Sequence, residues 1–173
     1  MSTAEQRMLI ACDATCVCVQ IIGPANFNRS IHFKSAVLRA LESGRCHVRL
    51  DLAECPTMDS TFLGVLAGLT RRLATSAAQG EMPIELLNPT PRVISLLDNL
   101  GVMHLFKLGR GANSMESALK LIEPERAGHD DLARNSLEAH EILTEVCPDN
   151  VERFKDVIHY LRESLNASKP AGE

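Results

Sequence analysis

Aromatic side chains are scarce in this sequence. They make up 3% of its 173 residues, with one tyrosine and no tryptophan. Proteins that bind single-stranded nucleic acids stack bases on aromatic faces, and phosphate binding needs clustered positive charge. The net charge is -4, and lysine and arginine form no long run. The composition therefore argues against a nucleic-acid partner.

Long apolar runs are absent as well. No stretch approaches the roughly 20 apolar residues of a membrane-spanning helix. Residues 1–6 lack the basic start and the apolar run of a secretory signal. We therefore expect a cytoplasmic protein that does not insert into membranes. Hydrophobic residues still make up 45% of the chain, which is enough to bury a core.

Metal-site spacing is missing too. The six cysteines include no C-x-x-C pair, and the six histidines are scattered. Cysteines of a cytoplasmic protein are expected to be reduced, and three of them lie in apolar, strand-like runs. His140 and His159 fall on expected helices, and we interpret them as surface or packing residues. We expect no metal and no cofactor.

Catalytic motifs are also absent. The sequence contains no H-E-x-x-H, Walker A or G-x-G-x-x-G pattern. Ser60 lies between an expected strand and an expected helix, as a nucleophile elbow does. Its surroundings, however, read Thr-Met-Asp-Ser-Thr rather than G-x-S-x-G. We therefore expect a protein that is not an enzyme.

What the sequence does contain is a regular alternation of strand and helix patterns. Two β-rich runs at 7–12 and 15–22 predict an antiparallel pair. Strands joined by helices predict parallel pairs with right-handed crossovers. The expected fold is therefore α/β, with a mixed, mainly parallel sheet of four to five strands. The remaining strands are expected at 47–52, 83–87 and 103–108, and the helices at about 28–43, 60–75, 91–100 and 113–122.

Polar residues mark the expected helix starts. Asn28 or Ser30 is a candidate N-cap of the first helix, and Asp59 or Ser60 of the second, because their side-chain oxygens can accept from free backbone N–H groups. Pro91 suits the first position of the third helix. In open α/β sheets the loops that follow the strands share one rim, where ligand and partner sites gather.

The C-terminal part of the chain has a different character. Residues 123–131 include a proline, a glycine and several charges, and they separate an expected domain at 7–122 from a helical hairpin extension at 129–166. Helices are expected at 131–146 and 149–165, the second opened by a capping-box pattern. A pair of about 40 residues is too small to fold alone reliably. We expect it to pack on the main domain, on a second copy in a homodimer, or on a partner.

Four segments in this order carry a family resemblance. They are residues 50–52, 58–66, 87–93 and 100–106. Together they resemble a STAS domain of the bacterial anti-sigma factor antagonist type, over roughly residues 8–122. Two features depart from the family pattern. Phe62 stands where the family often has glycine, and the early loop reads Gly-Pro-Ala-Asn-Phe-Asn from Gly23 instead of Gly-x-x-Asp.

The resemblance implies a phosphorylation switch. Such an antagonist binds a serine-kinase anti-sigma factor, which frees the sigma factor. The kinase then phosphorylates the Ser or Thr after the motif aspartate, and a metal-dependent serine phosphatase reverses the modification. By position the aspartate corresponds to Asp59 and the acceptor to Ser60, with Thr61 as the alternative.

The resemblance also implies a partner-binding surface made of the loops at one rim. An alternative function is that of a STAS subunit in a lipid or anion transport machine, or in another signalling assembly, without a sigma-factor role. The expected partner-binding residues are Asn26, Phe27, Asn28, Thr57, Met58, Asp59, Ser60, Thr61, Phe62, Leu63, Asn88 and Thr90.

Overall fold

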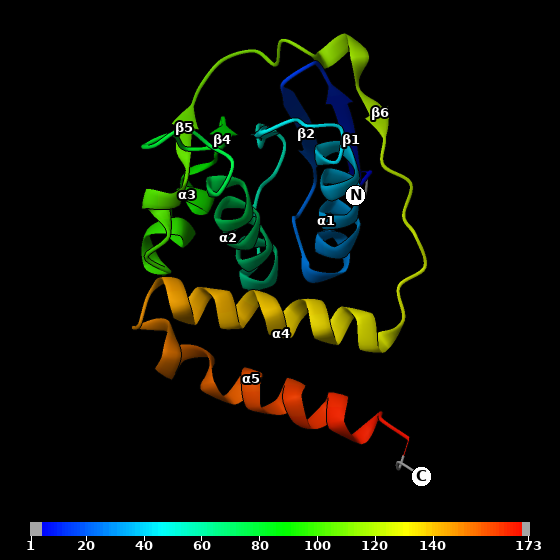
Figure 1. The fold of residues 1–173 in the computed structure, drawn as a ribbon, viewed down its shortest axis with the longest axis vertical. Helices are drawn as coiled ribbons and strands as arrows, with labels where there is room; N and C mark the ends of the chain where they lie inside the picture. Colours follow the sequence, from blue (N-terminus) through cyan, green and yellow to red (C-terminus); the bar gives the residue numbers. More distant parts are fainter. Residues whose placement is uncertain (1–4, 171–173) are drawn as a thin grey trace.

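Two antiparallel strands begin a mixed sheet, and parallel strands continue it. The computed structural model describes residues 5–170. Within them β1 (Arg7–Cys12) pairs antiparallel with β2 (Cys16–Ile22), as the sequence predicts. β2, β3 (His47–Asp51), β4 (Ile84–Leu87) and β5 (Lys107–Gly109) then pair in parallel. The strand order is β5-β4-β3-β2-β1-β6 (Figure 1).

The sixth strand corrects two expectations. The sheet has six strands rather than four to five, because β6 (Lys120–Leu121) pairs antiparallel with β1. The helix expected at 113–122 is absent: this segment forms only a 3-10 turn, η2 (Glu116–Ala118), before β6. Asn113 explains the difference, since its side-chain oxygen accepts from the backbone N–H of Met115 and so favours a turn over a helix.

The parallel strands alternate with helices, as expected. The run expected as a strand at 103–108 instead divides into a 3-10 turn and the short β5. The connecting elements are α1 (Phe27–Leu41), α2 (Ser60–Ala74), α3 (Pro91–Asn99) and η1 (Met103–Leu105).

The starts of α1, α2 and α3 differ in how well they match the predicted caps. Asn26 caps α1, so the candidates Asn28 and Ser30 were placed too late. Asp59 caps α2, which makes Ser60 the first helical residue and not the cap. Pro91 occupies the first turn of α3, as expected. α1 begins earlier than expected, at Phe27, directly after its cap Asn26.

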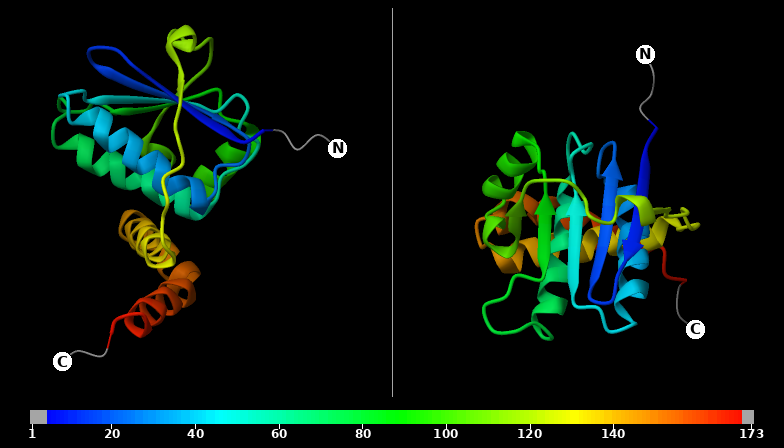
Figure 2. Two further views of the ribbon diagram at one scale, coloured as in Figure 1. Left: turned by 90° about the vertical axis from the view of Figure 1, so that its right-hand side faces the viewer. Right: turned by 90° about the horizontal axis from the view of Figure 1, so that it is seen from above.

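The hydrophobic core lies on one face of the sheet. Alternate strand residues, among them Val19, Leu50 and Leu86, are fully buried. They pack under α1 and α2, whose buried residues include Phe33 and Phe62. Figure 2 shows α1 and α2 together beneath this face. The sheet therefore holds the N-termini of both helices at one end of the molecule.

Two C-terminal helices add further layers to the same side. α4 (His129–Val146) crosses the outer surface of α1 and α2, and α5 (Asn150–Ala167) lies beyond it (Figures 1 and 2). Ala139 and Leu143 of α4 are buried against the main core, and Phe154 and Ile158 of α5 complete it. The capping box expected at the start of α5 does not form, because Asp149 makes no side-chain cap bond.

Candidate functional site

The loop before α2 is fastened to the loop before α1. Ala25 donates its backbone N–H to the carbonyl of Thr57, and Asp59 returns a backbone bond to the carbonyl of Ala25, both at 2.9 Å. Met58 and Ala25 form an isolated parallel bridge. The structure therefore brings together two of the loops that the sequence places at one rim.

The Asp59 carboxylate joins the N-termini of two helices. Its Oδ1 accepts from the backbone N–H of Phe62 in α2 at 2.8 Å, and its Oδ2 accepts from that of Phe27 in α1 at 2.6 Å. Burial raises the pKa of Asp59, while these two N–H donors act in the opposite direction. The carboxylate thus has a structural role in addition to its place in the family motif.

Ser60 follows directly and faces α4. It is half-buried, and its Oγ lies 3.0 Å from Nε2 of His140. The other ring nitrogen of His140, Nδ1, lies 2.7 Å from the carbonyl oxygen of Ser136. A carbonyl only accepts, so Nδ1 carries the proton. In the neutral ring Nε2 is then the acceptor, and the Ser60 hydroxyl donates to it.

His140 is held in its neutral form by its surroundings. The residue is only 4% exposed, and burial lowers its pKa below the ordinary histidine value, with the Ser136 carbonyl and Asp59 acting in the opposite direction. Its ring also meets the ring of Phe154 edge-on at 4.9 Å. The histidine is therefore fixed in one tautomer and one orientation.

Thr61, the alternative acceptor, is more deeply placed. It is 5% exposed, and its Oγ1 lies 2.9 Å from the hydroxyl oxygen of Ser136. Both hydroxyls at the start of α2 therefore face polar side chains of α4. Of the two, Ser60 is the more accessible.

Three expected partner-binding residues belong to the core instead. Phe62 and Leu63 are fully buried and Met58 is 5% exposed. Phe62 packs against Phe33 with ring centroids 4.9 Å apart. Neither Phe62 nor Met58 offers a surface to a partner in this conformation, and their expected role in partner binding stays a prediction. A large side chain at position 62 anchors α2 to α1, because it points inward at the first helical turn.

The remaining rim residues divide into exposed and structural ones. Phe27 is 46% exposed and Asn28 is exposed as well, so both are available to a partner. Thr57 is half-buried. Asn88, at a φ of 54°, exchanges hydrogen bonds with the backbone of Gly111. Thr90 caps α3, and neither residue is linked by a hydrogen bond to Ser60 in the described part of the chain.

Sequence reasoning missed His140 and Ser136. A contact 80 residues away along the chain leaves no trace in local periodicity. One signal was present: small residues line one face of α2, at Gly64 and Gly68, and such a face admits a close neighbour. The sequence does not indicate which segment packs on this face of α2.

Neither a metal centre nor a membrane span is visible in residues 5–170. No three His, Cys, Asp or Glu side chains there converge in a way that would hold an ion. No helix of that part is long and apolar enough to cross a bilayer.

Comparison with known proteins relates most of the chain to one family. The family model described as STAS domain matches residues 7–118. A putative anti-sigma factor antagonist from Thermotoga maritima is 21% identical, with a TM-score of 0.52 over 63% of this chain and 92% of that one. The unphosphorylated anti-sigma factor antagonist SpoIIAA is 18% identical, with a TM-score of 0.52 over 65% and 92%. No curated protein matches significantly. Identities this low show a shared fold.

Proposed function

The chain belongs to the STAS-domain family, and we propose that it is a phosphorylation-switched anti-sigma factor antagonist of bacterial cytoplasm. In this role the unmodified protein binds a serine-kinase anti-sigma factor, and phosphorylation of Ser60 ends the binding. A metal-dependent serine phosphatase restores the unmodified form. The observation that supports the proposal is the place of Ser60, the first residue of α2, directly after the capping Asp59.

The switch consists of one phosphoryl transfer. The Ser60 oxygen forms a bond to the γ-phosphorus of ATP held by the kinase, and the bond from that phosphorus to the β,γ-bridging oxygen breaks. ADP leaves, and the hydroxyl proton passes to a base of the kinase. In the reverse step a water oxygen replaces the serine oxygen on phosphorus, and inorganic phosphate is released.

The start of α2 suits this modification. A phosphoserine carries about -1.5 to -2 charges near neutral pH. At a helix N-terminus such a charge meets free N–H groups and the positive end of the helix dipole, so the fold tolerates it. The adjacent Asp59 carboxylate, and the cost of desolvating the phosphate, act against a partner surface. Binding is thus lost while the domain stays folded.

Ser60 is the acceptor rather than Thr61 in this proposal. Thr61 is 5% exposed, and its hydroxyl bonds to Ser136 beneath α4. Ser60 stands at the edge of the same contact and is half-buried. A kinase that reaches the start of α2 therefore meets Ser60 first.

The test is capture of partners from the native host on three forms of the chain. Wild type and Ser60→Ala are expected to retain a serine kinase, whereas Ser60→Asp is expected to lose it. Incubation of the captured kinase with ATP is expected to place one phosphate on Ser60 of the wild type, as located by mass spectrometry. Phosphate on another residue, or equal capture by all three forms, contradicts the proposal. Capture of transporter subunits instead supports the alternative function without a sigma factor.

A further inference from the structure

The C-terminal hairpin lies over the residue that the proposed switch modifies. Ser60 donates to His140, and Thr61 is bonded to Ser136, so α4 engages both hydroxyls at the start of α2. We propose that α4 is an intramolecular competitor of the kinase, and that Ser60 becomes a substrate only when α4 leaves α2. The inference rests on the proposed function and adds a closed, self-inhibited state to it.

The contact between the two helices leaves no space for another chain. A Cβ built on Gly64 of α2 would overlap the carbonyl oxygen of Ala139 and lie 2.6 Å from its carbonyl carbon. α4 therefore rests directly on the backbone of α2, one turn beyond Ser60. A kinase that docks on this face of α2 has to displace α4 first.

Phosphoryl transfer itself also requires the displacement. The γ-phosphorus must come into bonding contact with the Ser60 oxygen, on a path in line with the departing ADP. In the closed state the Ser60 hydroxyl points at Nε2 of His140, 3.0 Å away. His140 is 4% exposed, so the side of Ser60 that its hydroxyl faces is occupied by protein.

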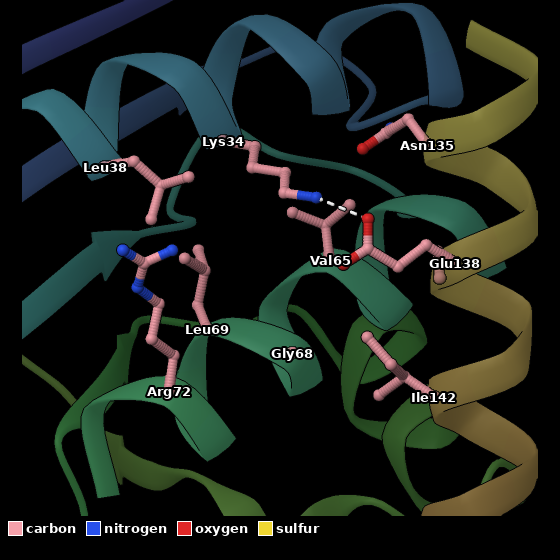
Figure 3. Close-up of a pocket in the computed structure, with 10 residues that line it drawn as sticks. Lys34, Leu38, Val65, Gly68, Leu69, Arg72, Asn135, Glu138 and Ile142 are labelled. Carbon is pink, nitrogen blue, oxygen red and sulfur yellow. Dashed lines mark hydrogen bonds and ion pairs between the residues drawn. The ribbon is translucent and has the colours of Figure 1, made fainter. Parts of the chain in front are cut away.

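One part of the interface is imperfectly packed, which favours a helix that can be displaced. A pocket of about 160 Å³, partly open to solvent, lies between α1, α2 and α4, lined by Val65 and Gly68 among others. Figure 3 shows Lys34 of α1 reaching across it to Glu138 of α4, at 2.8 Å. Asn135, which also lines it, is 6% exposed, and its Oδ1 has no hydrogen-bond partner among residues 5–170.

Such a defect lowers the free energy needed to open the interface. Atoms that line this pocket make fewer protein contacts than atoms of a close-packed interface, and a buried acceptor without a donor gives up its hydrogen bonds to water. Opening α4 hydrates the Asn135 oxygen, while it breaks the bond from the Asn135 amide to the Ser30 hydroxyl. The hydration offsets part of the cost of exposing Ala139 and Leu143.

Gly64→Ala provides the sharpest test, since its methyl group meets backbone. The Cβ cannot avoid the Ala139 carbonyl group unless α4 moves, while alanine favours α2 itself. Gly68→Ala is the matched control: its Cβ would lie 2.8 Å from the end of the Ile142 side chain, which can rotate away. His140→Ala is a second variant that weakens the contact without a clash.

The experiment compares Ser60 phosphorylation by the captured kinase and ATP with hydrogen exchange over residues 129–146. In Gly64→Ala and His140→Ala we expect faster exchange of α4 and phosphorylation faster by on the order of tenfold, as for a shift in the open population. Gly68→Ala is expected to behave as wild type in both measurements. Circular dichroism checks that each variant is folded.

Three other outcomes would contradict the inference, and one of them would also contradict the proposed function. Equal phosphorylation rates for wild type and Gly64→Ala, with α4 exchanging faster in the variant, overturn the inference and leave the proposed function intact. Unchanged exchange of α4 in both Gly64→Ala and His140→Ala overturns it as well. Absence of phosphate on Ser60 in every variant overturns the proposed function and the inference together.

Discussion

Ser60 and His140 are 80 residues apart along the chain, and their side chains meet at 3.0 Å. The bond joins the domain matched by the family model to a segment that the model does not cover. It therefore connects the proposed site of modification with the C-terminal helices outside the matched region.

His140→Ala is expected to lower the free energy of unfolding by about 2 kcal/mol or more, as large-to-small changes at buried sites do. The variant loses the bond to Ser60 and the edge contact with Phe154. Denaturant unfolding measures the change. His159→Ala is the control, because His159 is exposed; a change within about 0.5 kcal/mol is expected there. Equal effects of the two substitutions would show that the buried contact contributes little.

The docking of α4 is expected to weaken at acidic pH. The pKa of His140 lies below its ordinary value of 6.5, so the open state binds a proton more readily than the closed one. The contribution of neutral His140 is therefore complete above about pH 6.5 and is lost as pH falls through the lower pKa of the closed state. Hydrogen exchange of α4 measured from about pH 7.5 downward detects the loss.

The other groups that face His140 set the control for this pH dependence. Ser60 from α2 and the Phe154 ring from α5 are uncharged, and Asp59 is the charged neighbour. The pKa of Asp59 is raised from 3.8, so its effect on stability runs the other way. In His140→Ala the dependence below pH 6.5 is expected to vanish. Its persistence in that variant would assign it to another group.

Asp59→Ala is expected to cost about 2 kcal/mol of stability, more than Asp59→Asn, since N-cap losses alone reach about 0.5–2 kcal/mol. Alanine removes both acceptors, for Phe62 and for Phe27, whereas asparagine retains one. Thermal or denaturant unfolding distinguishes the three forms. Asp149→Ala is the control, because Asp149 stands before α5 without a cap bond. The same loss in all of these variants would contradict the bridging role of Asp59.

Asn150→Ala is expected to loosen α5 and to cost about 2 kcal/mol, because the Leu100 carbonyl loses the Asn150 amide and the Leu143 carbonyl keeps only the backbone N–H of Cys147. The Asn150 amide is 1% exposed and donates to the carbonyls of Leu100 and Leu143, at 2.9 and 3.0 Å. Unfolding and hydrogen exchange of residues 150–167 report the effect. Asn166→Ala, on the exposed end of α5, is expected to be neutral.

A homodimer through the C-terminal helices stays a prediction, and α5 offers the surface for it. Val151 and Tyr160 are 54% and 68% exposed on this helix. The two residues are nine positions apart and so lie on opposite faces of the helix. If two copies join through one of these faces, either Val151→Glu or Tyr160→Glu, made separately, is expected to convert a dimer into a monomer in light scattering, because buried charges oppose association. An unchanged mass would place any dimer contact elsewhere. A monomeric wild type would exclude the dimer at the concentration used.

Much of the fold could be predicted from local patterns. Apolar alternation located β1 to β4, and helical spacing with turn residues located α1, α2 and α3. The start of α2 was narrowed to Asp59 or Ser60, and the first of these is the cap. Periodicity succeeds in these segments because each presents one apolar face to a single core.

The errors have physical causes that a local pattern cannot reveal. β6 has two residues and exists because the edge of β1 offers it a partner, not because of its own composition. Phe62 looks like a surface residue beside polar neighbours, yet it points inward against Phe33. The pairing of Ser60 with His140 depends on how α4 folds back, and a long-range contact of this kind is set by packing.

The connection between β6 and α4 has a consequence for how strongly a partner must bind. Residues 122–128 form the whole connection, and Glu125 within it is paired with Arg39 of α1 at 2.6 Å. A displaced α4 therefore stays close to α2, at an effective concentration on the order of millimolar. Dilution of the protein leaves the competition by α4 unchanged, because α4 is part of the same chain. It reduces the binding of the kinase, which is a separate molecule. The fraction of chains with kinase bound at the start of α2 then depends on the amount of kinase in the cell. The connection at residues 122–128 determines the kinase concentration at which the kinase replaces α4.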